Sequence, residues 1–147
     1  MNERYLFRGK RTDNGEWEIG LLARYNEKYP CANIIDETEL LIPVETKTVG
    51  QCTGLKDKNG KLIFEGDLLR FTNDDGEQSI YRVFYDYVYA GWRMQAINFS
   101  GLDNMSNWEY TREYFEVIGN IHDTPNLLKL EHDSLCETEM YKAGDMK

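Results

Sequence analysis

Apolar and polar residues alternate with a period of two in several short segments of the chain, a pattern that predicts strands with one apolar face. The longest such segment spans residues 80–89. One face of this segment carries five apolar or aromatic side chains: Tyr81, Val83, Tyr85, Tyr87 and Tyr89. A turn at Ala90 and Gly91 then leads into a second alternating segment, so residues 80–97 are predicted to form a β-hairpin.

The first part of the chain shows the same alternation on a smaller scale. Residues 5–8 and 17–21 are both predicted to be strands, and Asn and Gly between them favour a turn, so together they predict an edge hairpin. In the second strand, Trp17, Ile19 and Leu21 alternate with polar residues or glycine and are expected to form its apolar face.

Two neighbouring segments have weaker patterns. Residues 25–38 have no clear period and contain Pro30, so we expect a loop there. Residues 40–44 are apolar but are interrupted by Pro43, which is typical of an edge strand because proline cannot donate to a sheet ladder.

The middle of the chain carries two structural turns. Asn59 and Gly60 separate a polar run from the apolar residues 62–64, which predicts a type I′ turn. Gly66 and Asp67 then separate two apolar runs. Glycine permits a close approach of the backbone and aspartate can accept from nearby amides, so this pair is expected to form a corner between two strands of a barrel.

The pattern is less regular toward the C-terminus. Residues 100–107 are polar and predict a loop, and residues 108–114 can hold one helical turn. Residues 115–121 predict a last strand, with Gly119 as a possible site of a bulge.

Together these elements predict a mainly β fold with little helix. Residues 1–55 are expected to form an N-terminal β lobe, residues 56–130 an SH3-like barrel, and residues 131–147 an acidic, weakly ordered tail. The length of 147 residues suits one domain with room for a second small lobe.

Composition narrows the classes of protein that fit. The chain is 41% hydrophobic, enough for a packed core, and its 17 basic and 26 acidic residues give a formal charge of -9, which disfavours binding to phosphate backbones. No apolar run is long enough to span a bilayer and none follows Met1 as in a signal peptide, so we expect no membrane partner. Three dispersed cysteines without a C-x-x-C motif argue against disulfides and zinc, and favour the cytoplasm.

Few residues offer catalytic or metal-binding chemistry. His122 and Asp123 form a possible general base and its orienting group, but a polar turn after the last strand is the favoured interpretation. Asp74, Asp75 and Glu77 can hold a hard cation, yet a solvated hairpin turn explains them too. We therefore expect no catalytic residue, no metal and no cofactor.

The aromatic residues are the strongest candidates for function. The expected interaction surface consists of aromatic side chains of the predicted hairpin: Tyr81, Tyr85, Tyr87, Tyr89 and Trp92. The same residues could instead pack in the core or stack on the bases of a nucleic acid. The charge of -9 favours a protein interface, and the one basic cluster is a small group near the N-terminus, which is expected to be a charged sheet edge: Arg4, Arg8, Lys10 and Arg11.

An ordered set of short motifs also resembles a known family. The motifs are Phe7-Arg8-Gly9-Lys10-Arg11, Glu16-Trp17, the segment 48–57, Gly60-Lys61, the segment 63–67 and the segment 115–121. This set resembles the YopX family of phage and prophage proteins over roughly residues 4–130. The resemblance implies a bacterial host, a β-rich fold with a barrel-like C-terminal half, and no assigned biochemical activity, so it supplies no catalytic residue.

These observations lead to one expectation and one alternative. We expect a non-enzymatic phage or prophage accessory protein in the bacterial cytoplasm that binds a protein partner, either itself or another chain. The alternative is a nucleic-acid-associated regulator, or an acidic decoy that mimics DNA and occupies a DNA-binding protein.

Overall fold

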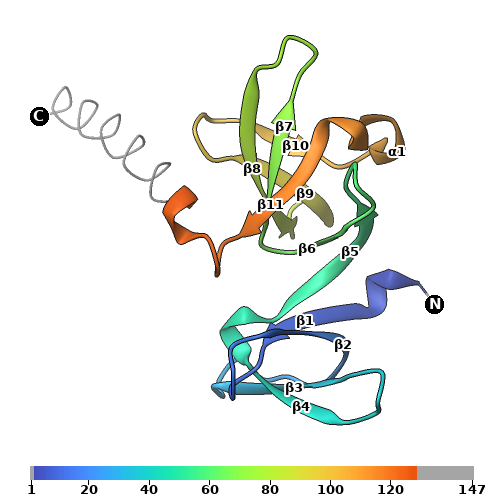
Figure 1. The fold of residues 1–147 in the computed structure, drawn as a ribbon, viewed down its shortest axis with the longest axis vertical. Coiled ribbons are helices and arrows are strands. Elements are labelled where there is room, and N and C mark those ends of the chain that lie inside the picture. Colours follow the sequence, from blue (N-terminus) through green and yellow to red (C-terminus); the bar gives the residue numbers. More distant parts are fainter. Residues whose placement is uncertain (1, 129–147) are drawn as a thin grey trace, which may run out of the picture. The chain divides into compact units, whose positions relative to one another are not determined.

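The computed structural model describes residues 2–128 and contains two antiparallel sheets (Figure 1). The prediction of a mainly β fold with little helix is confirmed. The chain forms two compact units: one runs from the N-terminus to Lys56 and includes Gly60–Glu65, and the other comprises Asp57–Asn59 and the chain from Gly66 onward. The predicted tail over residues 131–147 lies outside the described residues.

The first unit is a six-stranded sheet in the order β4-β3-β2-β1-β5-β6. Its strands are β1 (Leu6–Lys10), β2 (Trp17–Arg24), β3 (Cys31–Ile35), β4 (Leu41–Glu45), β5 (Gly50–Lys56) and β6 (Leu62–Phe64). Two short 3₁₀ turns, η1 (Glu3–Tyr5) and η2 (Thr46–Thr48), precede β1 and β5. The predicted edge hairpin corresponds to β1 and β2, but β1 is internal because it also pairs with β5.

The prediction of a loop over residues 25–38 is wrong in part, because residues 31–35 form β3. Ala32 and Ile34 of this strand are fully buried and belong to the core of the first unit. Pro30 is the residue directly before β3. It therefore does not remove a hydrogen-bond donor from the ladder of that strand. The predicted edge strand with Pro43 is β4, at the outer end of the sheet order.

The apolar face expected on β2 points away from this core. Ile19 and Leu21 are 47% and 41% exposed, whereas Leu22 packs against the buried residues of β3 and β4. Gly20 shares the face of Leu22, and a Cβ at this position would collide with the carbonyl oxygen of Ile35. The inward face of β2 thus includes a position where only glycine fits, while two of the larger apolar side chains of the strand point outward.

The second unit is a five-stranded sheet in the order β10-β9-β8-β7-β11. Its strands are β7 (Asp67–Thr72), β8 (Gln78–Asp86), β9 (Gly91–Ala96), β10 (Leu102–Asn104) and β11 (Phe115–Asn120). The first four strands form a meander. The chain then passes through α1 (Trp108–Thr111) and η3 (Arg112–Tyr114), and β11 returns to pair with β7 (Figure 1).

Several local predictions in this unit agree with the structure. The helical turn expected over residues 108–114 corresponds to α1 and η3, and the register of β11 shifts between Val117 and Gly119, where a bulge was predicted. Residues 102–104 of the expected loop form β10 instead. All three of its side chains are exposed, so they show no alternation.

The second sheet has two edges, and the described residues form no closed barrel. Strand β10 contains only three residues and pairs with β9 alone, so it cannot complete a ladder with β11. The SH3-like part of the fold prediction stays a prediction, and so do the predicted domain boundaries. The predicted strand over residues 80–89 is also too long at its end, because β8 stops at Asp86 and residues 87–90 form the turn.

Candidate interaction surface

The five aromatic residues proposed as an interaction surface do not lie on one surface. Tyr81 is 8% exposed and contacts three other rings, with centroid separations of 6.4 Å to Phe71, 6.1 Å to Phe99 and 6.1 Å to Phe115. Tyr81 is therefore a core residue of the second unit, and this corrects its assignment to the surface. It lies on the same face of β8 as Val83, which is 1% exposed.

The other four aromatic residues gather at the end of the β8–β9 hairpin. Tyr85 and Trp92 are direct partners across the two strands, and their rings meet edge to face at 5.3 Å. The ring of Tyr87 packs against Tyr85 at 5.2 Å in a second edge-to-face contact. These four aromatic residues and Val88 are called the hairpin tip below: Tyr85, Tyr87, Val88, Tyr89 and Trp92.

Asp86 and Arg93 hold the turn of the hairpin tip in place. The backbone N–H of Val88 donates to Oδ1 of Asp86 at 2.9 Å, and Nη1 of Arg93 lies 3.4 Å from Oδ2 of the same carboxylate. The guanidinium of Arg93 also lies over the ring of Tyr89, 4.4 Å from its centroid. Ala90 takes the left-handed conformation, with φ of 53°, and completes the turn.

The hairpin tip is apolar at its end and is exposed. Tyr87, Val88 and Tyr89 are 88%, 86% and 70% exposed. Tyr87, Val88 and Tyr89 contact Tyr85, Asp86 and Arg93 within the same hairpin. Because these contacts already hold the turn, binding there would order few additional side chains. Aromatic rings held in this way are typical of the residues that contribute most energy to protein interfaces.

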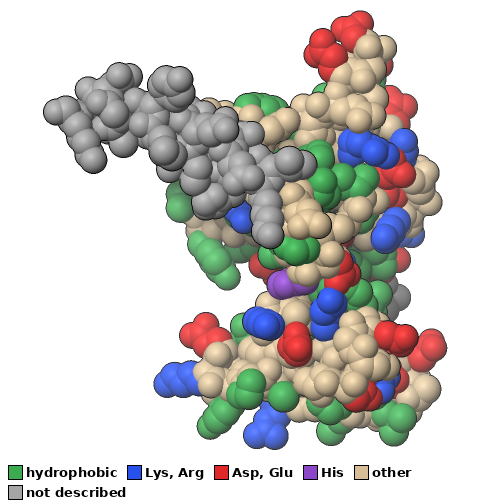
Figure 2. Space-filling model, turned by 60° about the vertical axis from the view of Figure 1, so that its left-hand side comes forward, with side chains coloured by type: hydrophobic (Ala, Val, Ile, Leu, Met, Phe, Trp, Pro, Cys, Tyr) green, Lys and Arg blue, Asp and Glu red, His purple; other side chains and the backbone are tan. Residues whose placement is uncertain are grey.

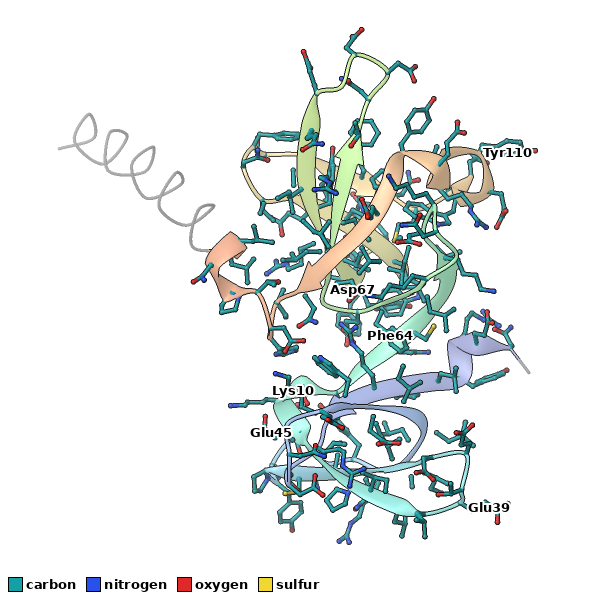
Figure 3. All side chains as sticks on the ribbon, in the orientation of Figure 1. Lys10, Glu39, Glu45, Phe64, Asp67 and Tyr110 are labelled. Carbon is teal, nitrogen blue, oxygen red and sulfur yellow. The ribbon has the colours of Figure 1, made fainter. Side chains whose placement is uncertain are left out.

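The predicted structural turns are placed as follows. Asn59 and Gly60 lie between β5 and β6, but only Gly60 has a positive φ, at 81°, so the turn is not type I′. Gly66 has φ of 88° in the turn before β7, and its N–H donates to the carbonyl oxygen of Val83 at 2.9 Å. Asp67 is the first residue of β7 and is 1% exposed (Figure 3).

The sequence did not identify Asp57, which is also 1% exposed. Its Oδ1 accepts from the N–H of Asn59 and its Oδ2 accepts from the N–H of Val117, both at 2.9 Å. Asp57 thus ties a turn to the last strand of the second unit. The only signal in the sequence is an aspartate two residues before the Asn-Gly pair, which suits an Asx turn but does not indicate the distant strand.

The N-terminal basic residues are largely engaged within the first unit. The guanidinium of Arg8 lies over the rings of Trp17 and Phe64, at 4.6 Å and 4.9 Å from their centroids (Phe64 is labelled in Figure 3). Arg11 pairs with Asp13 at 2.9 Å, and this contact lowers the pKa of the Asp13 carboxyl. Only part of the predicted basic edge is thus open to a phosphate.

His122, Asp123 and two of the cysteines lie in the described part of the chain. His122 and Asp123 lie in a turn after β11, where both backbone N–H groups donate to Oδ1 of Asn120 at 2.9 Å. Cys52 is fully buried in the first unit, and Cys31 is exposed. Within residues 2–128 there is no group of three His, Cys, Asp or Glu side chains suited to hold a metal ion.

The cation site weighed at residues 74–77 has the hydrogen bonds of a hairpin turn. Oδ1 of Asn73 accepts from the N–H groups of Asp75 and Glu77, at 3.0 Å and 2.9 Å. Its side-chain amide donates to Glu77. Figure 2 shows the acidic side chains of this turn at the top of the view.

Residues 6–129 match the family described as YopX protein. The chain belongs to the YopX family. The match covers the described strands of both units, from β1 to β11, and agrees with the resemblance carried by the motifs. No match was found among curated proteins. In the described part of this YopX protein, no helix is both long and apolar enough to cross a membrane.

Proposed function

We propose that this YopX protein is a non-enzymatic accessory protein of a phage or prophage, and that it acts in the bacterial cytoplasm by binding another protein. The observation that carries the proposal is the hairpin tip, where Tyr87, Val88 and Tyr89 are exposed while the turn below them is fixed by Asp86 and Arg93. Exposed aromatic residues on a rigid turn support a protein interface, since they bury much area and lose little conformational freedom.

The nucleic-acid alternative has weaker support. A single-strand binder combines stacking rings with a basic groove. At the hairpin tip, Arg93 pairs with Asp86 and lies over Tyr89, and Arg82 donates to Oε1 of Gln95 at 3.0 Å. With a formal charge of -9, the chain would also repel a phosphate backbone. The decoy form of the alternative depends only on the acidic charge and uses no particular residue.

The test compares capture of a partner by wild type and two variants. Tyr87→Ser with Tyr89→Ser removes the exposed rings of the hairpin tip, and Tyr110→Ser is the matched control. Tyr110 is 81% exposed and points outward from α1 in the same unit (Figure 3). Host lysate is passed over each immobilised protein and the bound proteins are quantified by mass spectrometry, while light scattering measures self-association.

We expect the double variant to lose at least about tenfold of a specific partner, or of self-association, because exposed aromatic anchors dominate binding energy. The control should retain it. Equal binding by wild type and double variant contradicts the proposal. A shift of DNA by wild type at low salt supports the regulator, and loss of the partner only when surface carboxylates are neutralised supports the decoy.

A further inference from the structure

A second surface of this unit has a different chemical character. An open groove of about 570 Å³ lies among β7, β8, β9, β10, η3 and β11. Four aromatic rings line it, from Phe71, Tyr81, Tyr114 and Phe115. Phe71 contacts the other three, with centroid separations of 6.4, 5.9 and 5.1 Å, and its ring is tilted or perpendicular to each. Phe71 and Tyr114 are partly exposed, whereas Tyr81 and Phe115 are buried, so the ring surface that a ligand can reach comes mainly from Phe71 and Tyr114.

The rim of this aromatic groove is acidic. Asp74 lies in the turn after β7 and Asp103 lies on β10, and both line the groove. Within the described part of the chain, no Lys or Arg side chain lines it. Two carboxylates that are far apart in the sequence therefore line the same groove. No basic residue of that lining neutralises their charge.

The nearby carboxylates raise the pKa of two tyrosines that line the groove. Burial raises the pKa of Tyr81, and the neighbouring Asp103 raises it further through its charge and a hydrogen bond. Asp74 and Glu113 raise the pKa of Tyr114 in the same way, with the charge of Asp74 as the largest cause. Each phenol thus lies beside at least one carboxylate of the groove, Tyr81 beside Asp103 and Tyr114 beside Asp74.

We propose that the aromatic groove binds an arginine side chain from a basic segment of a partner protein. Aromatic faces attract a cation, and the carboxylates of Asp74 and Asp103 supply acceptors for its N–H groups. An anion would be repelled, and a neutral apolar group would remove water from the carboxylates without replacing their hydrogen bonds. The planar guanidinium stacks on rings and donates up to five hydrogen bonds, so it fits this lining better than the compact ammonium of lysine.

The groove and the hairpin tip are separate sites. Tyr81 lines the groove near the start of β8, whereas Asp86 ends the strand at the tip. At ~3.3 Å per residue these two positions are roughly 17 Å apart. Binding of arginine at the groove therefore does not depend on the proposed role of the hairpin tip, and each site can fail without the other.

The test titrates the full chain, labelled with ¹⁵N, with three nine-residue peptides in about 0.15 M salt. The first peptide contains three arginines separated by glycine and serine, the second replaces arginine by lysine, and the third replaces it by uncharged citrulline. We expect the arginine peptide to bind most tightly, the lysine peptide about threefold to tenfold more weakly, and the citrulline peptide not at all. Amide shifts should appear at Asp103, Asn107 and Thr111 and not at residues 87–90.

Matched variants separate the site from the general negative charge of the chain. Asp103→Asn and Glu37→Gln each remove one negative charge, but Glu37 is an exposed residue of the first unit. We expect Asp103→Asn to weaken binding of the arginine peptide about tenfold and Glu37→Gln less than twofold. Asp74→Asn tests the same groove and should weaken binding to a similar extent; it keeps the hydrogen bond between Asp103 and the buried Tyr81, and alters only the one to the partly exposed Tyr114.

Three results would overturn the inference: equal binding of the citrulline peptide, equal effects of the Asp103 and Glu37 variants, or shifts confined to another surface. The double variant of the hairpin tip, Tyr87→Ser with Tyr89→Ser, should bind the arginine peptide as wild type does. A failure of the tip as a protein interface and a failure of the groove as an arginine site are therefore told apart by the same set of proteins.

Discussion

A tyrosine within β8 and two tyrosines in the turn that follows the strand have opposite environments. Near the start of the strand, Tyr81 is buried among three rings of the core. Beyond its end, Tyr87 and Tyr89 are almost fully exposed on a turn. Alternation along a strand thus predicts which side chains share a face, but how deeply each is buried depends on what the neighbouring strands and loops place over it.

Substitution of each tyrosine by alanine tests this contrast most directly. Tyr81→Ala should reduce the free energy of unfolding of the second unit by about 3–5 kcal/mol, since it opens a cavity among aromatic rings. Tyr87→Ala should change it by less than about 0.5 kcal/mol. NMR signals of the second unit followed through a urea titration give both values. Similar losses at the two positions would contradict the assignment of core and surface.

A substitution that removes a contact within the turn should lower the free energy of unfolding less than Tyr81→Ala does, but more than Tyr87→Ala does. Asp86→Ala removes the acceptor for the N–H of Val88 and leaves Arg93, which is 16% exposed, without its carboxylate. We expect a loss of about 2 kcal/mol and faster amide exchange at residues 87–90. Partner capture should fall although every ring is still present. Asp75→Ala, at an exposed position in the other turn of β8, is the control.

Exchange at residues 87–90 that is as slow in Asp86→Ala as in wild type would show that the carboxylate does not fix the turn. The hairpin tip would then be an exposed loop that becomes ordered only on binding. Its rings would remain available, but the entropic argument for a preformed interface would be lost.

Much of the fold follows from alternation in the sequence, and the exceptions have local causes. The pattern located β1, β2, β8, β9 and the bulge in β11. It missed β3, whose buried residues are too few to show a period, and β10, whose three side chains are all exposed. It also reversed the faces of β2, where Gly20 lies on the inward face too close to Ile35 for any side chain, a contact that alternation does not reveal.

The candidate site was predictable in its composition but not in its arrangement. The sequence identified the aromatic residues of the hairpin, yet it could not separate the buried Tyr81 from the exposed Tyr87. The groove escaped sequence reasoning because Asp74 and Asp103 belong to a turn and a short edge strand that meet only in the folded sheet. Long-range pairing of this kind leaves no periodic signal.

A smaller effect is expected at alkaline pH from the hydroxyl of Tyr81. Its pKa is raised above the ordinary value of about 10, so its contribution to stability is complete below that pH and is lost as pH rises through the folded-state pKa. Tyr81→Phe lacks the ionisable group and the hydrogen bond to Asp103, and should be about 1 kcal/mol less stable than wild type at pH 8.

The gap between wild type and Tyr81→Phe should therefore narrow as pH rises above about 10. Urea titrations at several pH values from 8 to 11.5 measure it. Lysines also titrate in this range, but they are common to both proteins and largely cancel in the difference. A gap that stays constant or widens would contradict the raised pKa of Tyr81.

The smallest change is expected at the tip itself, where Arg93 lies over the ring of Tyr89 at 4.4 Å. Tyr89→Leu removes this contact at an exposed site and should cost about 0.5 kcal/mol, whereas Tyr89→Phe keeps the ring and should cost less. The amount of partner protein captured should nevertheless fall clearly with Tyr89→Leu and not with the matched control Tyr110→Leu. A loss of stability well above 1 kcal/mol would make Tyr89 a structural residue like Tyr81, because the contribution of its ring to folding would then explain its position without a partner. A small loss of stability together with a large loss of capture is the combination that only a binding surface produces, and it would complete the contrast between Tyr81 and the exposed tyrosines of the turn.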